Sequence, residues 1–250
     1  MAGLLAIDVG NTQTVLGLFD GEELREHWRV ATESERTGDE LALLLRGLVD
    51  LSSLEGVALS CTVPALARSY EELAGRAGLE LLMLGPGTRT GIPIRYEDPR
   101  EVGPDRIANA VAALERYGAP CIVVDFGTST NFDVVSGAGE YLGGVIGPGV
   151  EISMEALTSR TAKLPRIDLS APEGPIGKHT QAAIQSGFAY GFAGLVDGID
   201  RRLADALGEK ATFIATGGLA ETIVPHCETI DEIDQLLTLR GLRLIHERNT

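Results

Sequence analysis

The stretch LAIDVGNT at residues 5–12 and the stretch IVVDFGTS at residues 122–129 share one pattern. In each, an apolar run ends in Asp-x-Gly and small polar residues, and a second β-rich run follows. A constant offset of 117 positions, the separation of Asp8 from Asp125, relates the two stretches. This repeat is far too long for a solenoid, so it predicts an internal duplication in which each copy begins with a strand-turn-strand corner.

The residues around the first corner predict the element order βββαβαβ. Apolar runs and alternating patterns predict strands at residues 4–9, 14–19, 24–30, 57–63 and 79–84. Helical spacing predicts helices near 41–48 and at 64–76. Thr37 or Asp39 can cap the first of these helices, and Pro64 suits the first turn of the second.

The rest of the chain predicts a second α/β half. A helix is expected to begin near Pro104, and after the second corner the pattern predicts a strand at 141–146, a helix from about residue 151, a long helix at 179–207, a strand at 212–215 and a closing helix after Leu236. No Pro- or Ser-rich linker separates the halves, so the predicted division is residues 1–115 and residues 116–250. The long helix carries four glycines at near-helical spacing, Gly187, Gly191, Gly194 and Gly198. They predict that another backbone segment, from this chain or from a second copy, packs closely against the helix.

Composition restricts the possible partners. The chain has 36 acidic and 21 basic residues and a net charge of −15, which repels nucleic acid and anionic membranes, so neither is an expected partner. ATP would need short-range features such as backbone amides, helix N-termini or bound cations. The three cysteines are scattered, no run of 18 apolar residues occurs, and the first residues lack the cationic start of a signal peptide. A cytoplasmic location is expected.

The first corner combines Asp8, Gly10, Asn11 and Thr12. Backbone N–H groups and hydroxyls after a glycine turn can hold phosphate oxygens. A carboxylate beside such a cradle favours phosphate only if a divalent cation lies between them, so Asp8 is a candidate magnesium ligand. Taken alone, the pattern favours an ordinary hairpin turn over a phosphate site by roughly three to one.

Repetition changes this interpretation. Two such corners can face each other across a cleft and hold one nucleotide, the second of them built from Asp125, Gly127, Thr128, Ser129 and Thr130. A third glycine corner, TGG at residues 216–218, follows the strand at 212–215 and is expected to open a helix, where backbone amides suit an adenosine or phosphate contact.

Three corners in this order resemble the actin-like ATPases, which include acetate kinase, sugar kinases and heat-shock chaperones. Within that superfamily the chain is most similar to the type III pantothenate kinases. The resemblance spans nearly the whole chain and rests on DVGNT at 8–12, GPDR at 103–106, DFGTSTNFD at 125–133, GGVIGPG at 143–149, IGKHT at 176–180, QSG at 185–187, TGGLA at 216–220 and LTLRGLRLIHERN at 237–249. Pro104 departs from the alanine expected in GPDR, but it fits the first turn of a helix. A Walker A motif is absent.

The resemblance implies a duplicated actin-like (ribonuclease H-like) fold and transfer of the ATP γ-phosphoryl group to pantothenate. Asp105 is the implied catalytic base, and Asp125 the implied site of an activating potassium or ammonium ion, although its spacing would equally suit magnesium. The residues implied to bind ATP are Asp8, Val9, Gly10, Asn11, Thr12, Gly127, Thr128, Ser129 and Gly217. Those implied to bind pantothenate are Tyr96, Gly103, Pro104, Asp105, Arg106 and Thr180. A homodimer is also implied, and no role is assigned to Arg160, Lys163 or His179.

The sequence is compatible with two alternative functions. Another actin-like kinase, acting on a sugar or a small carboxylate, would explain the corners but not GPDR together with Tyr96. A regulatory relative without catalysis would keep the fold, and loss of Asp8, Asp105 or Asp125 would favour it; all three are present. No helix-turn-helix precedes the fold, which disfavours a DNA-binding repressor.

Overall fold

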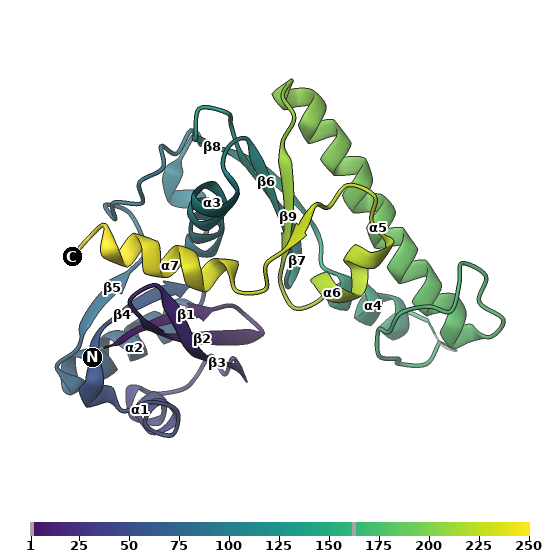
Figure 1. The fold of residues 1–250 in the computed structure, drawn as a ribbon. Helices are drawn as coiled ribbons and strands as arrows, with labels where there is room; N and C mark the ends of the chain where they lie inside the picture. Colours follow the sequence, from purple (N-terminus) through teal and green to yellow (C-terminus); the bar gives the residue numbers. More distant parts are fainter. Residues whose placement is uncertain (1–2, 162–163) are drawn as a thin grey trace. The chain divides into compact units, whose positions relative to one another are not determined.

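The computed structural model describes residues 3–161 and 164–250 (Figure 1). The chain divides into two compact units, each built on a five-stranded sheet. The first unit consists of the residues up to Ala112 and of Leu237–Thr250, and the second unit consists of Ala113–Leu236.

Sheet A of the first unit has the strand order β3-β2-β1-β4-β5. Strands β1 to β3 form an antiparallel meander, and β4 and β5 continue the sheet in parallel with β1. The strands are β1 (Gly3–Val9), β2 (Gln13–Asp20), β3 (Glu23–Ala31), β4 (Leu54–Cys61) and β5 (Glu80–Met83); the helices are α1 (Gly38–Arg46), α2 (Pro64–Ala77), α3 (Pro104–Tyr117) and α7 (Leu237–Glu247), with short 3-10 turns at Leu51–Ser53 and Pro99–Glu101. The predicted order βββαβαβ is confirmed.

Sheet B of the second unit has the order β10-β9-β6-β7-β8. Its β6, β7 and β8 repeat the antiparallel meander, and β9 and β10 repeat the parallel strands. The elements are β6 (Cys121–Phe126), β7 (Ser129–Val135), β8 (Tyr141–Pro148), β9 (Thr212–Thr216), β10 (Glu232–Ile233), α4 (Val150–Ser159), α5 (Thr180–Leu207) and α6 (Ala220–Ile223), with a 3-10 turn at Val224–His226. The common topology of the two sheets confirms the predicted duplication.

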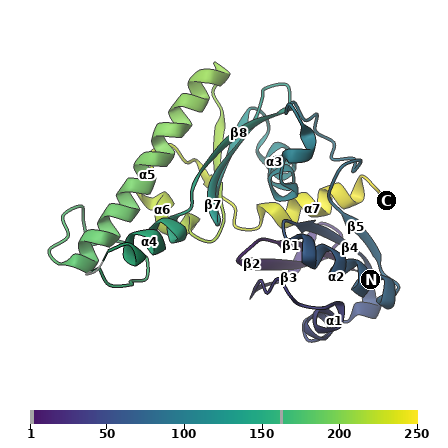
Figure 2. The ribbon, with the colours of Figure 1, turned by 180° about the vertical axis from the view of Figure 1, so that it is seen from behind.

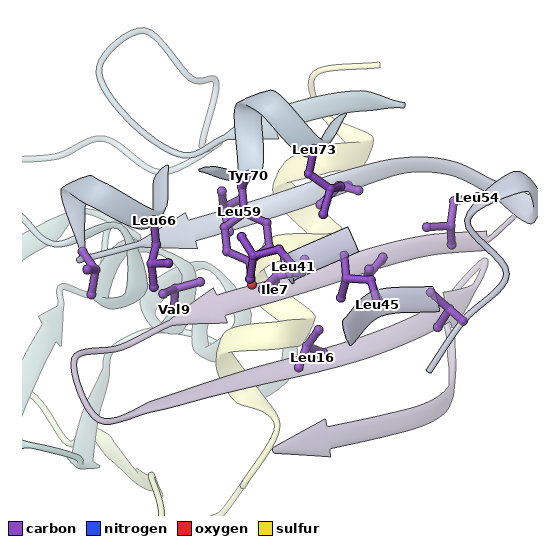
Figure 3. Packing of buried hydrophobic residues seen from close by; sticks show 14 residues of the cluster. Ile7, Val9, Leu16, Leu41, Leu45, Leu54, Leu59, Leu66, Tyr70 and Leu73 are labelled. Atoms are coloured by element: carbon purple, nitrogen blue, oxygen red, sulfur yellow. The ribbon is translucent and has the colours of Figure 1, made fainter. Parts of the chain in front are cut away.

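Alternation along β1 assigns its side chains to two faces of sheet A. Ile7 and Val9 point to the face covered by α1 and α2, where they pack in one apolar cluster (Figure 3). That cluster includes Leu16, Leu41, Leu45, Leu59, Leu66, Tyr70 and Leu73. Thr37 begins α1 with a complete capping box, as one of the two predicted caps. Asp8 therefore belongs to the opposite face of the sheet.

Helix α7 covers that opposite face of sheet A, as both views of the ribbon show (Figures 1 and 2). A Cβ at Gly17 of β2 would lie 2.8 Å from Cδ1 of Leu239, and one at Gly56 of β4 would lie 3.0 Å from Nε2 of His246. The helix thus rests almost directly on the sheet backbone. The sequence-based division placed α7 with residues 116–250, whereas it packs in the first unit because its apolar stripe needs this face.

The second unit contains a buried carboxylate pair on α5. Asp197 and Asp200 both contact Thr229, whose hydroxyl oxygen lies 2.9 Å from Oδ1 of Asp197 and 2.6 Å from Oδ2 of Asp200. A hydroxyl has one proton and can donate to only one of them. Asp197 Oδ1 also accepts from the N–H groups of Glu228 and Thr229, so it is the oxygen that suits a charge. When Asp200 is protonated, it can therefore donate to the Thr229 hydroxyl oxygen.

Burial has the matching effect on Asp200, since it raises the pKa of this fully buried carboxyl from 3.8 to about 7. Below pH 3.8 the folded and unfolded chains are both protonated at this position. As pH rises from 4 to 7, only the unfolded chain loses its proton, so stability falls through this window.

We predict that Asp200→Asn, which keeps the donor to Thr229, stabilises the protein above pH 7 by on the order of 2 kcal/mol and changes little at pH 4. Urea unfolding at several pH values measures this. The exposed Asp205 on the same helix supplies the control, Asp205→Asn, which should show no such pH dependence. An Asp200→Asn variant that is equally destabilised at pH 5 and pH 8 would contradict the protonated state.

Candidate active site

The first corner lies where β1 turns into β2. The N–H of Gly10 donates to the carbonyl of Gln13 at 3.0 Å, which closes a tight turn directly after Val9. Asp8 is partly buried at the strand end, whereas Asn11 and Thr12 are exposed in the turn. A carboxylate, backbone amides and a hydroxyl are thus presented together, as the sequence predicted.

Strand β4 ends beside this corner and adds groups that the sequence reasoning missed. Ser60 pairs with Asp8 in parallel register, and Thr62 donates both its N–H and its hydroxyl to the carbonyl of Val9, each at 3.0 Å. The hydroxyl of Ser60 is buried and makes no hydrogen bond within the described residues. The carboxyl ends of parallel strands meet at one sheet edge, so the strand at 57–63 was the available signal.

The second corner, between β6 and β7, repeats this construction. The N–H of Gly127 donates to the carbonyl of Ser129 at 3.1 Å, and the Ser129 hydroxyl lies 2.9 Å from Oδ1 of Asn131. Asp125 is partly buried, while Gly127 and Thr128 are exposed. Both corners therefore present a carboxylate, amides and hydroxyls within their own units.

The third corner contacts the second one directly. Gly217 has φ of +91°, and a Cβ there would lie 2.5 Å from Oδ1 of Asp125 and 2.7 Å from the backbone nitrogen of Phe126. The parallel pairing of β6 with β9 produces this approach, because it places Asp125 opposite Thr216. The expected helix does follow, as the single turn α6.

Asp105 lies in the first turn of α3, and Pro104 is the first residue of that helix, as predicted. A Cβ on Gly103 would overlap Oδ1 of Asp105, so the carboxyl folds back over the Cα of Gly103. Burial raises the pKa of Asp105, and a hydrogen bond from the N–H of Arg106 opposes the shift. Arg106 itself is buried.

The remaining predicted residues belong to other elements than the corners. Tyr96 is partly buried in the extended segment before α3, and Thr180 is the exposed first residue of α5. Thr180 lines an open, mostly apolar groove of about 720 Å³ formed by α4, α5 and the segment before α5. His179, to which the sequence assigned no role, is the N-cap of α5, where its Nδ1 accepts from the N–H of Ala182 at 3.3 Å. Lys163 lies outside the described residues.

The donor set near Asp8 fits magnesium that arrives with a nucleotide. Magnesium is commonly held by one or two carboxylates together with substrate phosphates and waters. Among residues 3–161 and 164–250, no group of three or more His, Cys, Asp or Glu side chains could form an all-protein metal cage. None of the helices formed by these residues has the length and apolar character of a membrane span.

Comparison with solved structures defines the class of the fold. The chain superposes on a Campylobacter jejuni protein assigned to the Baf family of transcriptional activators, with a TM-score of 0.64, 18% identity and 98% of each chain covered. It also superposes on an inorganic polyphosphate/ATP-glucomannokinase from Arthrobacter sp. strain KM, with a TM-score of 0.53, 16% identity and coverage of 99% and 100%. Both are similar in fold, and the fold is the duplicated actin-like one.

Comparison with known sequences defines the family. A family model described as type III pantothenate kinase matches residues 4–202. A type III pantothenate kinase of Moorella thermoacetica is 53% identical over 99% of this chain and 100% of that protein, and one of Acidothermus cellulolyticus is 52% identical over 98% of each. The chain belongs to the type III pantothenate kinase family.

We predict that Gly217→Ala destabilises the protein by more than about 3 kcal/mol, because the added methyl group must displace Asp125 or the Phe126 backbone. Gly208 supplies the matched control: its φ is +67°, but a Cβ there meets nothing within 4 Å. Gly208→Ala should therefore show only the conformational cost, about 1 kcal/mol. Urea unfolding of both variants measures the difference, and equal losses would show that no close approach exists at Gly217.

Proposed function

We propose that this chain transfers the γ-phosphoryl group of ATP to the primary hydroxyl of pantothenate, giving 4'-phosphopantothenate, the first step of coenzyme A biosynthesis. The observation that carries this proposal is the full-length match at 53% identity to a named type III pantothenate kinase. The presence of Asp8, Asp105 and Asp125 at their expected positions supports it.

ATP is proposed to bind through the glycine corners. The exposed amides and hydroxyls after Gly10 and Gly127 suit phosphate oxygens, and Gly217 lies against the Asp125 corner. The full proposed set is Asp8, Val9, Gly10, Asn11, Thr12, Gly127, Thr128, Ser129 and Gly217. Asp8 would hold magnesium, which supplies charge neutralisation on the phosphates when bound.

Asp125 is proposed to hold the activating monovalent cation, potassium or ammonium. Its carboxylate is partly buried, and it is packed against Gly217. A cation there would offset the negative charge that Asp125 otherwise adds beside a phosphate site. Magnesium at Asp125 is the alternative, and a requirement for potassium at saturating magnesium separates the two.

Asp105 is proposed to act on the substrate hydroxyl. As the hydroxyl oxygen bonds to the γ-phosphorus, the bond to the ADP oxygen breaks and the hydroxyl proton passes to the Asp105 carboxylate. The burial that raises the pKa of Asp105 makes it a stronger base than an exposed aspartate. Arg106 is proposed to bind the pantothenate carboxylate, as a guanidinium can do with two hydrogen bonds. Tyr96, Gly103, Pro104 and Thr180 complete the proposed substrate set.

A homodimer is proposed to form along α5. A Cβ added at Gly187, Gly191 or Gly194 would meet no atom of the described chain within 4 Å, so no internal helix covers these glycines. Gly187 and Gly191 line the same open groove as Thr180, together with Phe188 and Phe192. An apolar groove beside uncovered glycines suits a second copy of the helix. A monomeric mass in sedimentation at assay concentrations would contradict this proposal.

The setting follows from charge and family. With a net charge of −15, neither nucleic acid nor an anionic membrane is a proposed partner. The cytoplasm is the proposed location, where ATP and magnesium are supplied.

We predict ADP release that requires pantothenate, ATP, magnesium and potassium together, and that falls by about 10²- to 10⁴-fold in Asp105→Asn because the proton acceptor is lost. A coupled assay of ADP release from the purified protein measures this. Glu101, an exposed carboxylate shortly before α3, gives the control variant Glu101→Gln, which should keep normal turnover.

Three outcomes are informative. Release that ignores pantothenate but responds to a sugar would reassign the acceptor. A folded protein that binds ATP without turnover on any acceptor would favour a regulatory relative. Full activity of Asp105→Asn would remove Asp105 from the chemistry while keeping the reaction.

A further inference from the structure

Helix α7 has no role in the proposed reaction. It carries none of the proposed site residues, yet it contacts the sheet with Asp8 and the helix with Asp105. Sheet A, α7 and the residues of α3 up to Ala112 belong to the first unit.

The contact of α7 with sheet A is made on the face to which Asp8 belongs. Gly17 of β2 pairs with Ala6, two residues before Asp8 on the same face of β1. A Cβ at Gly17 would lie 2.8 Å from Leu239, so the first turn of α7 rests on the sheet at this level. This contact sets how closely the first turn of α7 approaches the sheet next to the strand that carries Asp8.

The contact of α7 with α3 is made backbone to backbone. A Cβ at Gly241 would overlap the carbonyl oxygen of Ala108 and lie 2.5 Å from its carbonyl carbon. Ala108 follows Asp105 by three residues, so it lies on the next turn of the same helix face. The absence of a side chain at Gly241 therefore sets how closely α3 approaches α7.

A side-chain hydrogen bond sets the position of α3 along this contact. The hydroxyl of Thr238 lies 2.7 Å from Oδ1 of Asn109, whose side chain is fully buried. Thr238 and Gly241 are three residues apart and so share one face of α7, just as Ala108 and Asn109 are adjacent on α3. Together the two contacts restrain both the spacing and the sliding of the helices.

We infer that Thr238 and Gly241 are positioning residues for the phosphoryl transfer, because they hold α3 where the Asp105 carboxylate meets the substrate hydroxyl. This inference rests on the proposed function. Proton transfer tolerates little displacement, and an error of about 1 Å in such a geometry can lower turnover by roughly 100-fold.

The test is a pair of substitutions at Thr238, assayed for pantothenate-dependent ADP release per folded protein. Thr238→Val keeps the shape but loses the hydroxyl, and we expect roughly a tenfold loss of kcat with little change in KM for ATP. Thr238→Ser keeps the hydroxyl and should restore kcat to within about twofold of the wild type. Gly241→Ala should lower kcat in the same way, and if it fails to fold, the Thr238 pair still decides.

A second arm separates positioning from general stability. In an Asp105→Asn background there is no catalytic carboxylate left to misplace, so adding Thr238→Val should leave the residual kcat unchanged within about twofold. The inference is overturned if Thr238→Val turns over normally, if Thr238→Ser does not rescue it, or if the loss is equally large in the Asp105→Asn background. A wild-type protein without pantothenate-dependent turnover would overturn the proposed function, and this inference with it.

Discussion

The parallel pairing of the first strand with the fourth in each half is the constraint on which the site depends. In sheet A it aligns Asp8 with Ser60, and in sheet B it aligns Asp125 with Thr216. Because parallel strands end at the same edge, the glycine corners and the strand that follows them are brought together there. The strand topology therefore positions the carboxylates, amides and hydroxyls that are proposed to bind phosphate. The duplication repeats this arrangement in the second half.

The two faces of sheet A differ in what they carry: one carries the apolar cluster, and the other carries Asp8. The face with Ile7 and Val9 is an apolar cluster under α1 and α2 and can be filled without polar groups. The face with Asp8 must accept a helix as well as a carboxylate, and it does so through glycines that let α7 lie almost on the backbone. Because Gly17 and Gly56 have no side chains, α7 covers this face of the sheet at close range.

Local patterns predicted most of the fold, because strands, caps and glycine turns are encoded within a few residues. The corners at Asp8 and Asp125, the start of α3 at Pro104 and the cap at Thr37 all belong to this class. Contacts between distant residues could not be predicted from one sequence. The approach of Gly217 to Asp125, the buried Ser60 beside Asp8 and the packing of α7 in the first unit depend on strand register and on which face a helix covers. The two-residue strand β10 was also missed, since so short a segment has no periodicity.

The central claim is that each glycine corner takes part in binding ATP, and calorimetric titration with a non-hydrolysable ATP analogue and magnesium tests it most directly. The variants Thr12→Val and Thr128→Val each remove one exposed hydroxyl from one corner. The account predicts an affinity for the nucleotide that is weaker in both variants, by roughly fivefold or more in each. A corner variant that binds the nucleotide with unchanged affinity would contradict it.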